Sequence, residues 1–482
     1  MSNGWRNSWQ FKRSAGSFAE RARRPLDSRR GRRRYHIIPE VTETTSEREL
    51  HFRQMRDVAR DIFIFALKNA SIDSAFARHV SCERGVLRIC EDLHDLDSYS
   101  RVFVVSIGKA AHTMVAALES QVGSRFEGIV ASSVQPASQV RGFRYFQGGH
   151  PTPTAESIQA ADAILKSLNS LNAASLVIFM ISGGGSSIAE KPMDDEIALP
   201  DLVATYRALV HSGAPIAEIN AIRKHLSAVK GGRLAQAAYP AQQVSILVSD
   251  VPEATPDALA SGPTMPDSTS IADCERIVEQ YRLMEQFPKS VADLFRQHVI
   301  EETPKSDDPS FVRARWWTVL SNKVAVEEAT LAATRAGFAV EVDNSCDDWD
   351  YEKAAEYLVE RVRELRKSVS RVCLISGGEV TVSVRNGGVG GRNQQFALAC
   401  AEKIAGEEIT VLSAGTDGID GNSPAAGAVV DGTTVERAGG KETVRTALAG
   451  FNAHPLLEAL GDVIATGPTG NNLRDLRILL AY

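Results

Sequence analysis

The sequence predicts a layered α/β protein. Short apolar runs rich in β-branched residues recur along the chain, and each run stops at Gly, Ser or Asp. Continuous apolar runs are typical of strands that are buried on both faces, as they are in a parallel sheet. Segments with helical spacing often follow these runs, and strands that alternate with helices of about 10–15 residues indicate βαβ units.

The first predicted element is a helix. It starts near Ser46 and continues through residues 48–70, because apolar residues recur there at helical spacing with charged residues between them. Strands that end in turns are predicted at 101–111, 175–187, 243–253, 371–381 and 408–421. Further helices are predicted at 155–171 and 321–337.

We predict two domains after an N-terminal tail. Residues 302–315 are polar and charged and contain two prolines, which is typical of a linker or a long surface loop. This segment divides a large domain at 46–305 from a smaller domain at 306–482. Every second residue from Val380 to Val384 is valine, and this alternation predicts a half-exposed strand and therefore a mixed sheet in the smaller domain.

Residues 1–45 are predicted to be a disordered basic tail. Residues 1–34 contain eleven Arg and Lys residues against Glu20 and Asp27, and such a segment buries too little apolar surface to fold. A basic arm and a transit-like peptide are the alternatives, whereas the missing apolar stretch excludes a secretory signal. The whole chain has a net charge of -6 although its tail is strongly positive, so the rest of the chain is acidic. We therefore expect no nucleic-acid partner, because phosphate contacts need a basic face.

Composition excludes other classes of protein. No apolar run approaches the ~18 residues that a membrane helix needs, so we expect no membrane partner. The six cysteines are scattered and form no CxxC pair, which disfavours a zinc site or a disulfide framework and fits the reducing cytoplasm. The motifs of P-loop nucleotide hydrolases and of dinucleotide-binding Rossmann units are both absent.

The residues expected to carry chemistry follow the predicted strands, because ligands of open α/β sheets bind at the carboxyl ends of strands. The strongest signal is an SGGGSS turn, which consists of Ser182, Gly183, Gly184, Gly185, Ser186 and Ser187. Glycines let the backbone bring several N–H groups to one point, and the next helix adds its N-terminal dipole. Such a nest suits a phosphate or a carboxylate. A tight turn without a ligand is the alternative.

Two cations are candidates for contact with an anionic substrate. Lys109 emerges where a predicted strand becomes a helix, which suits a compact cation for a phosphoryl group or a carboxylate. A solvated surface lysine is the alternative. Arg392 lies in GGRNQ before an apolar helix, and its guanidinium suits planar recognition of carboxylate or phosphate. His150 and His225 lie near glycine-rich motifs, and each is either a base or a structural hydrogen bonder.

Three carboxylates follow three different predicted strands: Asp250, Glu379 and Asp417. If they converge, they can hold Mg²⁺ through one or two direct oxygens and water. The loop DGIDGN at 417–422 lacks the remaining ligand pattern of an EF-hand. A β-turn with Asx capping is the alternative for this loop.

In chain order, these motifs resemble those of the glycerate 2-kinases of the MOFRL family, the class II glycerate kinases. The resemblance covers about residues 50–482, and its motifs are SIGKAA, GGHPTPTAES, ISGGGSS, EINAIRKHLSAVKGGRLA, LVSDVPEATPDALASGPT, SGGEVTV, GGVGGRNQQFALA, SAGTDGIDGNSPAAGAVVD and TGPTGNNLRDL. It implies a large Rossmann-like domain, a smaller α/β domain, and an active site in the cleft between them.

The resemblance also implies a reaction. It is the ATP-dependent phosphorylation of D-glycerate at the 2-hydroxyl, with Mg²⁺, to give 2-phosphoglycerate and ADP in glycerate, serine and glyoxylate metabolism. Lys109 and Arg392 correspond to the proposed catalytic residues of the family. Gly378, Asn393 and Asn472 join the SGGGSS turn as expected nucleotide- or substrate-binding residues.

Two alternatives stay open at this point. One is a hydroxypyruvate reductase, a label that members of the family have carried, although the missing dinucleotide fingerprint argues against it. The other is a non-catalytic binding protein that uses its basic arm on nucleic acid or a membrane. The sequence does not decide whether the chain forms a homo-oligomer, and the only partners we expect with it are the small molecules D-glycerate and ATP.

Overall fold

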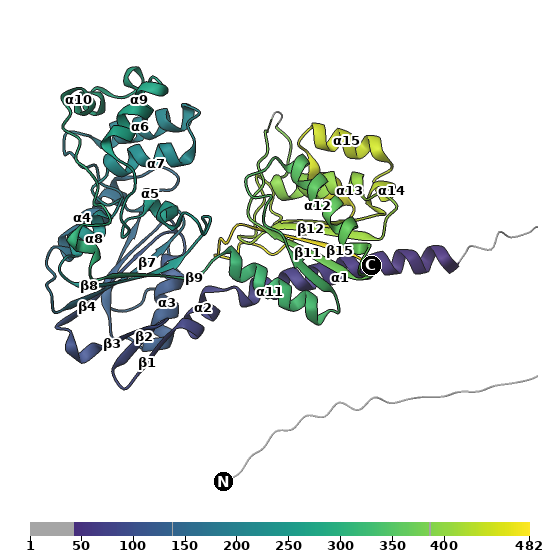
Figure 1. The fold of residues 1–482 in the computed structure, drawn as a ribbon, viewed down its shortest axis with the longest axis horizontal. Coiled ribbons are helices and arrows are strands. Elements are labelled where there is room, and N and C mark those ends of the chain that lie inside the picture. The colour runs from purple at the N-terminus through teal and green to yellow at the C-terminus, as the bar shows by residue number, and fades with distance from the viewer. Residues whose placement is uncertain (1–42, 137, 385–386) are drawn as a thin grey trace, which may run out of the picture. The chain divides into compact units, whose positions relative to one another are not determined.

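The first large sheet consists of parallel strands in the order β6-β5-β4-β7-β8-β9. Its strands β4, β7, β8 and β9 are labelled in Figure 1. The computed structural model describes residues 43–136, 138–384 and 387–482, with side chains from residue 47 onward. The strands of this sheet are β4 (Arg101–Ile107), β5 (Glu127–Ser132), β6 (Phe143–Gln147), β7 (Ser175–Ser182), β8 (Gln242–Val248) and β9 (Ala314–Leu320). The prediction of a parallel sheet is therefore confirmed.

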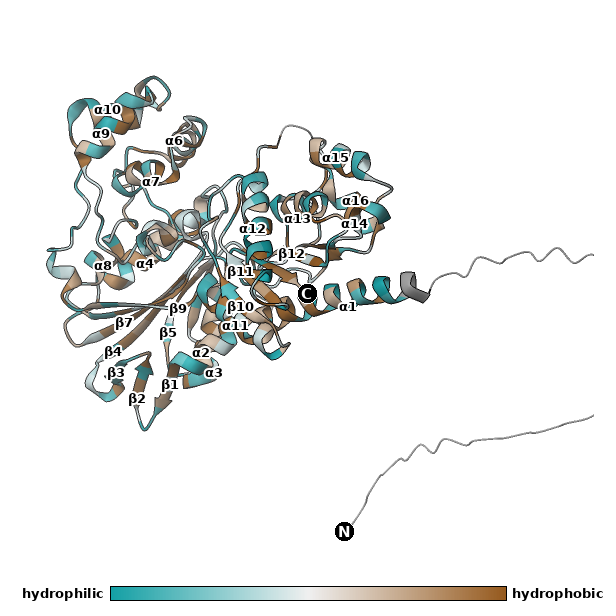
Figure 2. Ribbon diagram, turned by 45° about the vertical axis from the view of Figure 1, so that its right-hand side comes forward, coloured by the Kyte–Doolittle hydropathy of each residue, from teal (hydrophilic) through white to brown (hydrophobic). Residues whose placement is uncertain are grey.

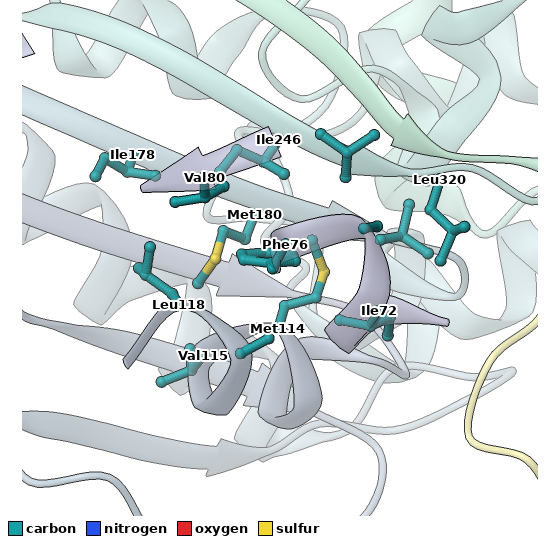
Figure 3. Close-up of a cluster of buried hydrophobic side chains, with 14 of the residues drawn as sticks. Ile72, Phe76, Val80, Met114, Val115, Leu118, Ile178, Met180, Ile246 and Leu320 are labelled. Atoms are coloured by element: carbon teal, nitrogen blue, oxygen red, sulfur yellow. The ribbon is translucent and has the colours of Figure 1, made fainter. Parts of the chain in front are cut away.

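Strand β7 shows why continuous apolar runs form this sheet. All of its residues are buried. Leu176, Ile178 and Met180 belong to the core on one face, whereas Val177, Phe179 and Ile181 belong to the core on the other face. In Figure 3, Ile178 and Met180 lie close to Met114, Val115 and Leu118 of the helix that follows β4. A strand that is covered on both faces needs apolar residues at every position.

The chain reverses its direction across the sheet between β4 and β7. It first builds β4, β5 and β6 outward, and then returns to place β7 on the other side of β4. The ends of β4 and β7 therefore form a topological switch point, which is where open α/β sheets bind ligands. Lys109 follows one of these strands and the SGGGSS turn follows the other.

Helices and a small antiparallel sheet surround the first sheet. The order of the small sheet is β1-β2-β3, with β1 (Val80–Glu83), β2 (Val86–Ile89) and β3 (Asp92–Asp95). The helices are α2 (Ile72–His79), α3 (Ala111–Val122), α4 (Ala155–Leu168), α5 (Gly185–Ile188) and α8 (Arg233–Ala238). A separate apolar core is formed by α6 (Leu199–His211), α7 (Ile216–His225), α9 (Ile271–Gln280) and α10 (Lys289–Gln297). Short 3-10 helices are η1 (Leu96–Ser98), η2 (Pro256–Ser261), η3 (Leu283–Glu285) and η4 (Pro309–Phe311).

The second large sheet is mixed, as predicted, with the order β10-β11-β15-β12-β13-β14. Its strands are β10 (Ala339–Val342), β11 (Val372–Gly377), β12 (Ile409–Gly415), β13 (Gly427–Asp431), β14 (Val463–Ile464) and β15 (Asp475–Ala481). Among these described strands, only β10 and β11 pair in parallel. The last strand, β15, lies between β11 and β12 and runs antiparallel to both, so it begins where those strands end.

Helices pack on both faces of the second sheet. One face packs against α12 (Tyr351–Arg366) and α13 (Arg392–Lys403), and the other packs against α1 (Glu43–Asn69) and α11 (Asn322–Arg335). The remaining helices are α14 (Thr434–Arg437), α15 (Lys441–Ala449) and α16 (Ala453–Ala459). In Figure 2, strands such as β4 and β7 are largely brown, whereas the coloured part of α1 alternates brown and teal.

Two local predictions were wrong. Residues 380–384 form no strand, because Thr381 makes only an isolated bridge to Asp350 and Val384 is exposed. The sheet is mixed for a different reason, which is the antiparallel insertion of β15. The segment 302–315 does not end the first sheet, since β9 starts at Ala314 and pairs with β8. The change of sheet thus comes after Leu320, beyond the boundary predicted at 305–306.

Three predicted helices are confirmed, whereas most of the predicted tail lies outside the described residues. The helices predicted at 48–70, 155–171 and 321–337 are confirmed as α1, α4 and α11. The tail predicted at 1–45 lies outside the described residues except for its last three positions. All six cysteines are free. None of the described helices is both long and apolar enough to cross a membrane.

Candidate active site

The turn after β4 and the SGGGSS turn after β7 are joined by hydrogen bonds. The backbone N–H of Lys109 donates to the Gly183 carbonyl at 2.9 Å, and the N–H of Ala110 donates to the Ser182 hydroxyl oxygen at 3.1 Å. The Lys109 side chain is exposed. No carboxylate within the described residues forms an ion pair with its ammonium group. The switch point thus presents a lysine whose charge is available to a ligand.

Gly184 leaves the space that the Lys109 side chain occupies. Its φ is +80°, and a Cβ at this position would lie 3.1 Å from Lys109 Cγ and 3.0 Å from His150 Cδ2. The lysine and the histidine therefore flank the glycine closely. Burial and the Lys109 charge both lower the pKa of His150, so this imidazole is mostly neutral at pH 7.

We expect Gly184→Ala to lower kcat beyond what the cost in backbone stability alone would explain. The left-handed backbone conformation costs roughly 1–2 kcal/mol for alanine, and the new methyl group displaces Lys109 and His150. Gly337→Ala is the matched control, because Gly337 has a φ of +84° with nothing within 4 Å of an added Cβ. Thermal unfolding and kcat measured on both variants check this. Equal kcat values for the two variants would show that the position of Lys109 does not depend on Gly184.

The serines of the SGGGSS turn are engaged within the protein. Ser182 is buried, and its hydroxyl holds the β4 turn. The Ser186 hydroxyl lies 2.8 Å from that of Ser261, and the Ser187 hydroxyl lies 3.5 Å from the Gly184 carbonyl. The helix that follows, α5, is only one turn long. We predicted that the next helix adds its N-terminal dipole to this turn. Because α5 is so short, no long helix supplies that dipole, and this part of the prediction is wrong.

Asp250 follows β8 and packs against the same turn. A Cβ on Gly183 would lie 1.9 Å from Asp250 Oδ2, so only glycine leaves room for the carboxylate. Burial raises the pKa of Asp250, and the charges of Lys109 and Arg474 oppose that rise. The carboxylate therefore lies near a cation from each sheet.

Arg392 is the first residue of α13, and carboxylates fix its orientation. Its Nε donates to Asp475 Oδ2 at 2.6 Å and its Nη2 donates to Asp475 Oδ1 at 2.9 Å. Its Nη2 also lies 2.9 Å from Glu379 Oε1. Burial alone would lower the pKa of Arg392, but Asp475 and Glu379 outweigh it and raise that pKa. Arg392 is thus a permanently charged group in a fixed plane.

Glu379 and Asp417 complete the group of carboxylates. Burial and the Asp475 charge raise the pKa of Glu379, against the effect of Arg392. Burial also raises the pKa of Asp417, whereas the charges of Arg392 and Lys109 lower it. The charges of both predicted catalytic cations therefore act on Asp417. Lys109 follows β4 of the first sheet, whereas Arg392 begins α13, which packs on the second sheet.

The predicted binding residues beyond the SGGGSS turn differ in their surroundings. Asn393 is buried, and its amide contacts Asp420 and Ser413. The side-chain oxygen of Asn472 accepts the backbone N–H of Arg474 at 3.0 Å. These contacts give both asparagines a structural role, and a role in binding stays a prediction.

Gly378 and His225 also lie in defined environments. Gly378 has a φ of +94°, and its N–H donates to Asn322 Oδ1 at 3.1 Å. The positive φ therefore accounts for a glycine at this position, and no contact with a ligand is needed to explain it. His225 is buried with its ring nitrogens against the Ala221 carbonyl and Glu302, each at 2.8 Å. Of the two open readings of this histidine, the contacts favour the structural hydrogen bonder.

Sequence reasoning missed three charged residues of this site. Arg474 has a φ of +68° and donates to both carboxylate oxygens of Asp347, at 2.7 and 2.6 Å. Asp475 is fully buried beneath Arg392. Arg474 and Asp475 lie in TGPTGNNLRDL, but they reach the site only because β15 begins between the ends of β11 and β12. The charged pair Arg474 and Asp475, directly before the last apolar run, was the available signal in the sequence.

The carboxylates do not form a ready-made metal centre. In the described ranges, no group of three His, Cys, Asp or Glu side chains could hold a metal ion together. Magnesium usually keeps several waters and takes only one or two carboxylates together with substrate phosphates. Burial raises the pKa values of Asp250, Glu379 and Asp417, and a nearby cation would oppose this rise by favouring the ionised carboxylates. The residues therefore fit a magnesium ion that arrives with a nucleotide.

By fold and site, the chain is an α/β protein with a cationic site at the strand ends. Residues 58–296 match the model of a domain of unknown function, DUF4147, and residues 372–475 match the model of the MOFRL family. A D-glycerate 2-kinase of Thermotoga maritima is 34% identical over 388 residues, which cover 78% of this chain and 90% of that protein. The chain therefore belongs to the glycerate 2-kinase family.

Two further comparisons bear on this family. A crystal structure of glycerate kinase from Thermotoga maritima superposes with a TM-score of 0.78 at 31% identity, covering 89% of this chain and 100% of that one. A protein of Agrobacterium vitis that is 36% identical over 391 residues, covering 79% of this chain and 87% of that protein, carries the provisional name of a hydroxypyruvate reductase.

Proposed function

We propose that the chain is a phosphotransferase that uses ATP to phosphorylate D-glycerate at the 2-hydroxyl, giving 2-phosphoglycerate and ADP. The observation that carries this proposal is the placement of two cations at strand ends: Lys109 is anchored at the SGGGSS turn, and Arg392 is held in a fixed plane by Asp475. Phosphoryl transfer depends on positioning and on cations around the transferred group. The family relationship supports the same reaction.

The two cations have different surroundings and therefore different roles. Lys109 lies at the SGGGSS turn without a carboxylate partner in the described part of the chain, so it is assigned to the transferred phosphoryl group. Arg392 is oriented by Asp475 through Nε and Nη2, and no described acceptor takes up its Nη1. We assign Arg392 Nη1 to the glycerate carboxylate or to the phosphoryl oxygens beside it.

A partly buried carboxylate accepts the proton of the 2-hydroxyl. Asp250, Glu379 and Asp417 all have raised pKa values, mainly because of burial. A higher pKa makes a carboxylate a stronger base, provided that it is ionised at the working pH. One of these residues acts as the base, and the others would hold a magnesium ion that arrives with the nucleotide. Magnesium, when bound, supplies positive charge to the phosphate oxygens.

Product analysis tests this function. Purified protein is incubated with D-glycerate and Mg·ATP, and the product is identified by ³¹P and ¹³C NMR. We expect 2-phosphoglycerate, no turnover after chelation of magnesium with EDTA, and recovery when magnesium is restored. Formation of 3-phosphoglycerate would contradict the assigned position. Oxidation of NADH with hydroxypyruvate in the absence of ATP would favour the reductase instead.

A further inference from the structure

A second feature of the first sheet lies beside the SGGGSS turn. A cavity of about 540 Å³ is bounded on one side by Gly184, Ser186 and Asp250. Residues of α6 and α7 bound the other side. Because Gly184 lies between Lys109 and His150, the cavity opens next to the cation assigned to the phosphoryl group.

Arg223 of α7 lines this cavity without an anionic partner. Its guanidinium lies over the ring of Tyr206, 4.7 Å from the ring centroid. Among the described residues it forms no ion pair, and its buried Nε has no hydrogen-bond acceptor. Burial lowers the pKa of Arg223, since no carboxylate compensates for its loss of water. A half-buried guanidinium without a partner is costly to the folded chain, and a bound anion would remove that cost.

The Tyr206 ring that supports Arg223 is itself held in place. Its hydroxyl donates to Glu190 Oε2 at 2.5 Å. Glu190 is fully buried, accepts the Ser227 hydroxyl at 2.6 Å, and forms an ion pair with Lys230. The guanidinium therefore rests on a fixed aromatic surface, and its free edge is preorganised for an anion.

The cavity has walls suited to more than a small acid. Val203, Val210 and Ile216 line it, and the last two are 56% and 65% exposed. A three-carbon acid such as glycerate would occupy only a fraction of a cavity of about 540 Å³. A flat base and a chain of phosphates would use both the apolar wall and the cations.

A second cavity, of about 620 Å³, has Arg474 and the exposed Lys323 as its cations, and its described lining includes no half-buried guanidinium that lacks a partner. It is lined by Gly378, Asp347 and Arg474. Arg474 is already bound to both oxygens of Asp347. An anion at Arg474 would have to compete with the Asp347 carboxylate, whereas an anion at Arg223 would not.

We infer that Arg223 binds a phosphate group of the nucleotide and that the cavity between α6, α7 and the SGGGSS turn is the nucleotide pocket. This inference rests on the proposed function, because it takes ATP as the phosphate donor. The phosphates run from Arg223 past Gly184 toward Lys109, and the base lies against Val210 and Ile216. Arg207, which also lines the cavity and has no ion pair in the described part of the chain, adds a second positive charge.

The test is Arg223→Gln, with Arg296→Gln as the matched control. Arg296 is an exposed arginine of α10 that pairs with Asp293 of its own helix. We expect Arg223→Gln to raise KM for ATP about tenfold or more, with KM for D-glycerate within about twofold of wild type. Titration calorimetry with Mg·ADP should show the same loss of affinity. Unchanged nucleotide affinity would overturn the inference, as would a rise confined to KM for D-glycerate.

Arg223→Lys keeps the test decisive if the first variant is unstable. Lysine retains the charge but loses the fork and the planar stack on Tyr206, so we expect an affinity for Mg·ADP between those of wild type and Arg223→Gln. If a folded Arg223→Lys variant binds Mg·ADP with wild-type affinity, the inference that the stacked guanidinium of Arg223 grips a phosphate through its fork is wrong. If wild-type protein binds Mg·ADP through Arg223 yet makes no phosphoglycerate, the proposed function fails and the nucleotide pocket stands.

Discussion

Lys109→Ala should lower kcat for glycerate phosphorylation by about 10²–10³-fold, the range found when one preorganised charge-stabilising donor is removed. Lys109 is exposed and forms no ion pair within the described residues, so its removal breaks no ion pair and should change stability little. The measurement is a coupled assay of ADP release at saturating ATP and D-glycerate.

Lys166→Ala is the control for this variant. Lys166 is an exposed lysine in the last turn of α4, and its loss should leave kcat unchanged. Near wild-type turnover by Lys109→Ala would remove this residue from the site.

The pH dependence of the residual activity gives a second readout of Lys109. Its charge lowers the pKa of both Asp250 and Asp417. Without that charge, both carboxylates stay protonated to higher pH, and a protonated carboxyl cannot accept the hydroxyl proton. The acid limb of kcat should therefore move to higher pH in Lys109→Ala. An unmoved limb would mean that neither carboxylate limits the acid side.

Arg392→Lys should lower kcat by about 10²-fold or more, although the positive charge is retained. Arg392 holds Asp475 through two parallel hydrogen bonds and also contacts Glu379. A lysine cannot reproduce this fork, so the group that faces the substrate loses its fixed plane. The measurement is kcat and KM for both substrates, together with the midpoint of thermal unfolding.

The control for Arg392 is an arginine with an ordinary surface ion pair. Arg445 pairs with Glu402 and is 60% exposed, so Arg445→Lys should change neither kcat nor the unfolding midpoint. If Arg392→Lys loses stability but keeps its kcat, the arginine is a structural support for Asp475, and its catalytic assignment is wrong.

The sequence predicted the strands that carry buried apolar runs, because burial on both faces demands apolar residues at every position. Strand β7 is the clearest case. There was no comparable signal for β9, whose exposed and half-buried residues follow a polar segment. Nor could α1 be assigned to a sheet, since an amphipathic helix shows that one face is buried but does not identify what covers it.

The predictable part of the site is the part that follows glycine-rich strand ends. Lys109, Asp250 and the SGGGSS turn meet because β4, β7 and β8 are neighbours. Asp475 and Arg474 escaped prediction because their place depends on the order of strands in the second sheet. The final strand inserts between two earlier ones, and nothing in its local sequence specifies that pairing.

A crystal structure of the protein with Mg·ADP, aluminium fluoride and D-glycerate would test the central claim most directly. The fluoride group stands in for the phosphoryl group during transfer. We predict that Lys109 Nζ and an Arg392 nitrogen lie within about 3 Å of that group or of the glycerate carboxylate beside it, with the 2-hydroxyl in line. A complex in which the fluoride group binds away from both cations would contradict the account.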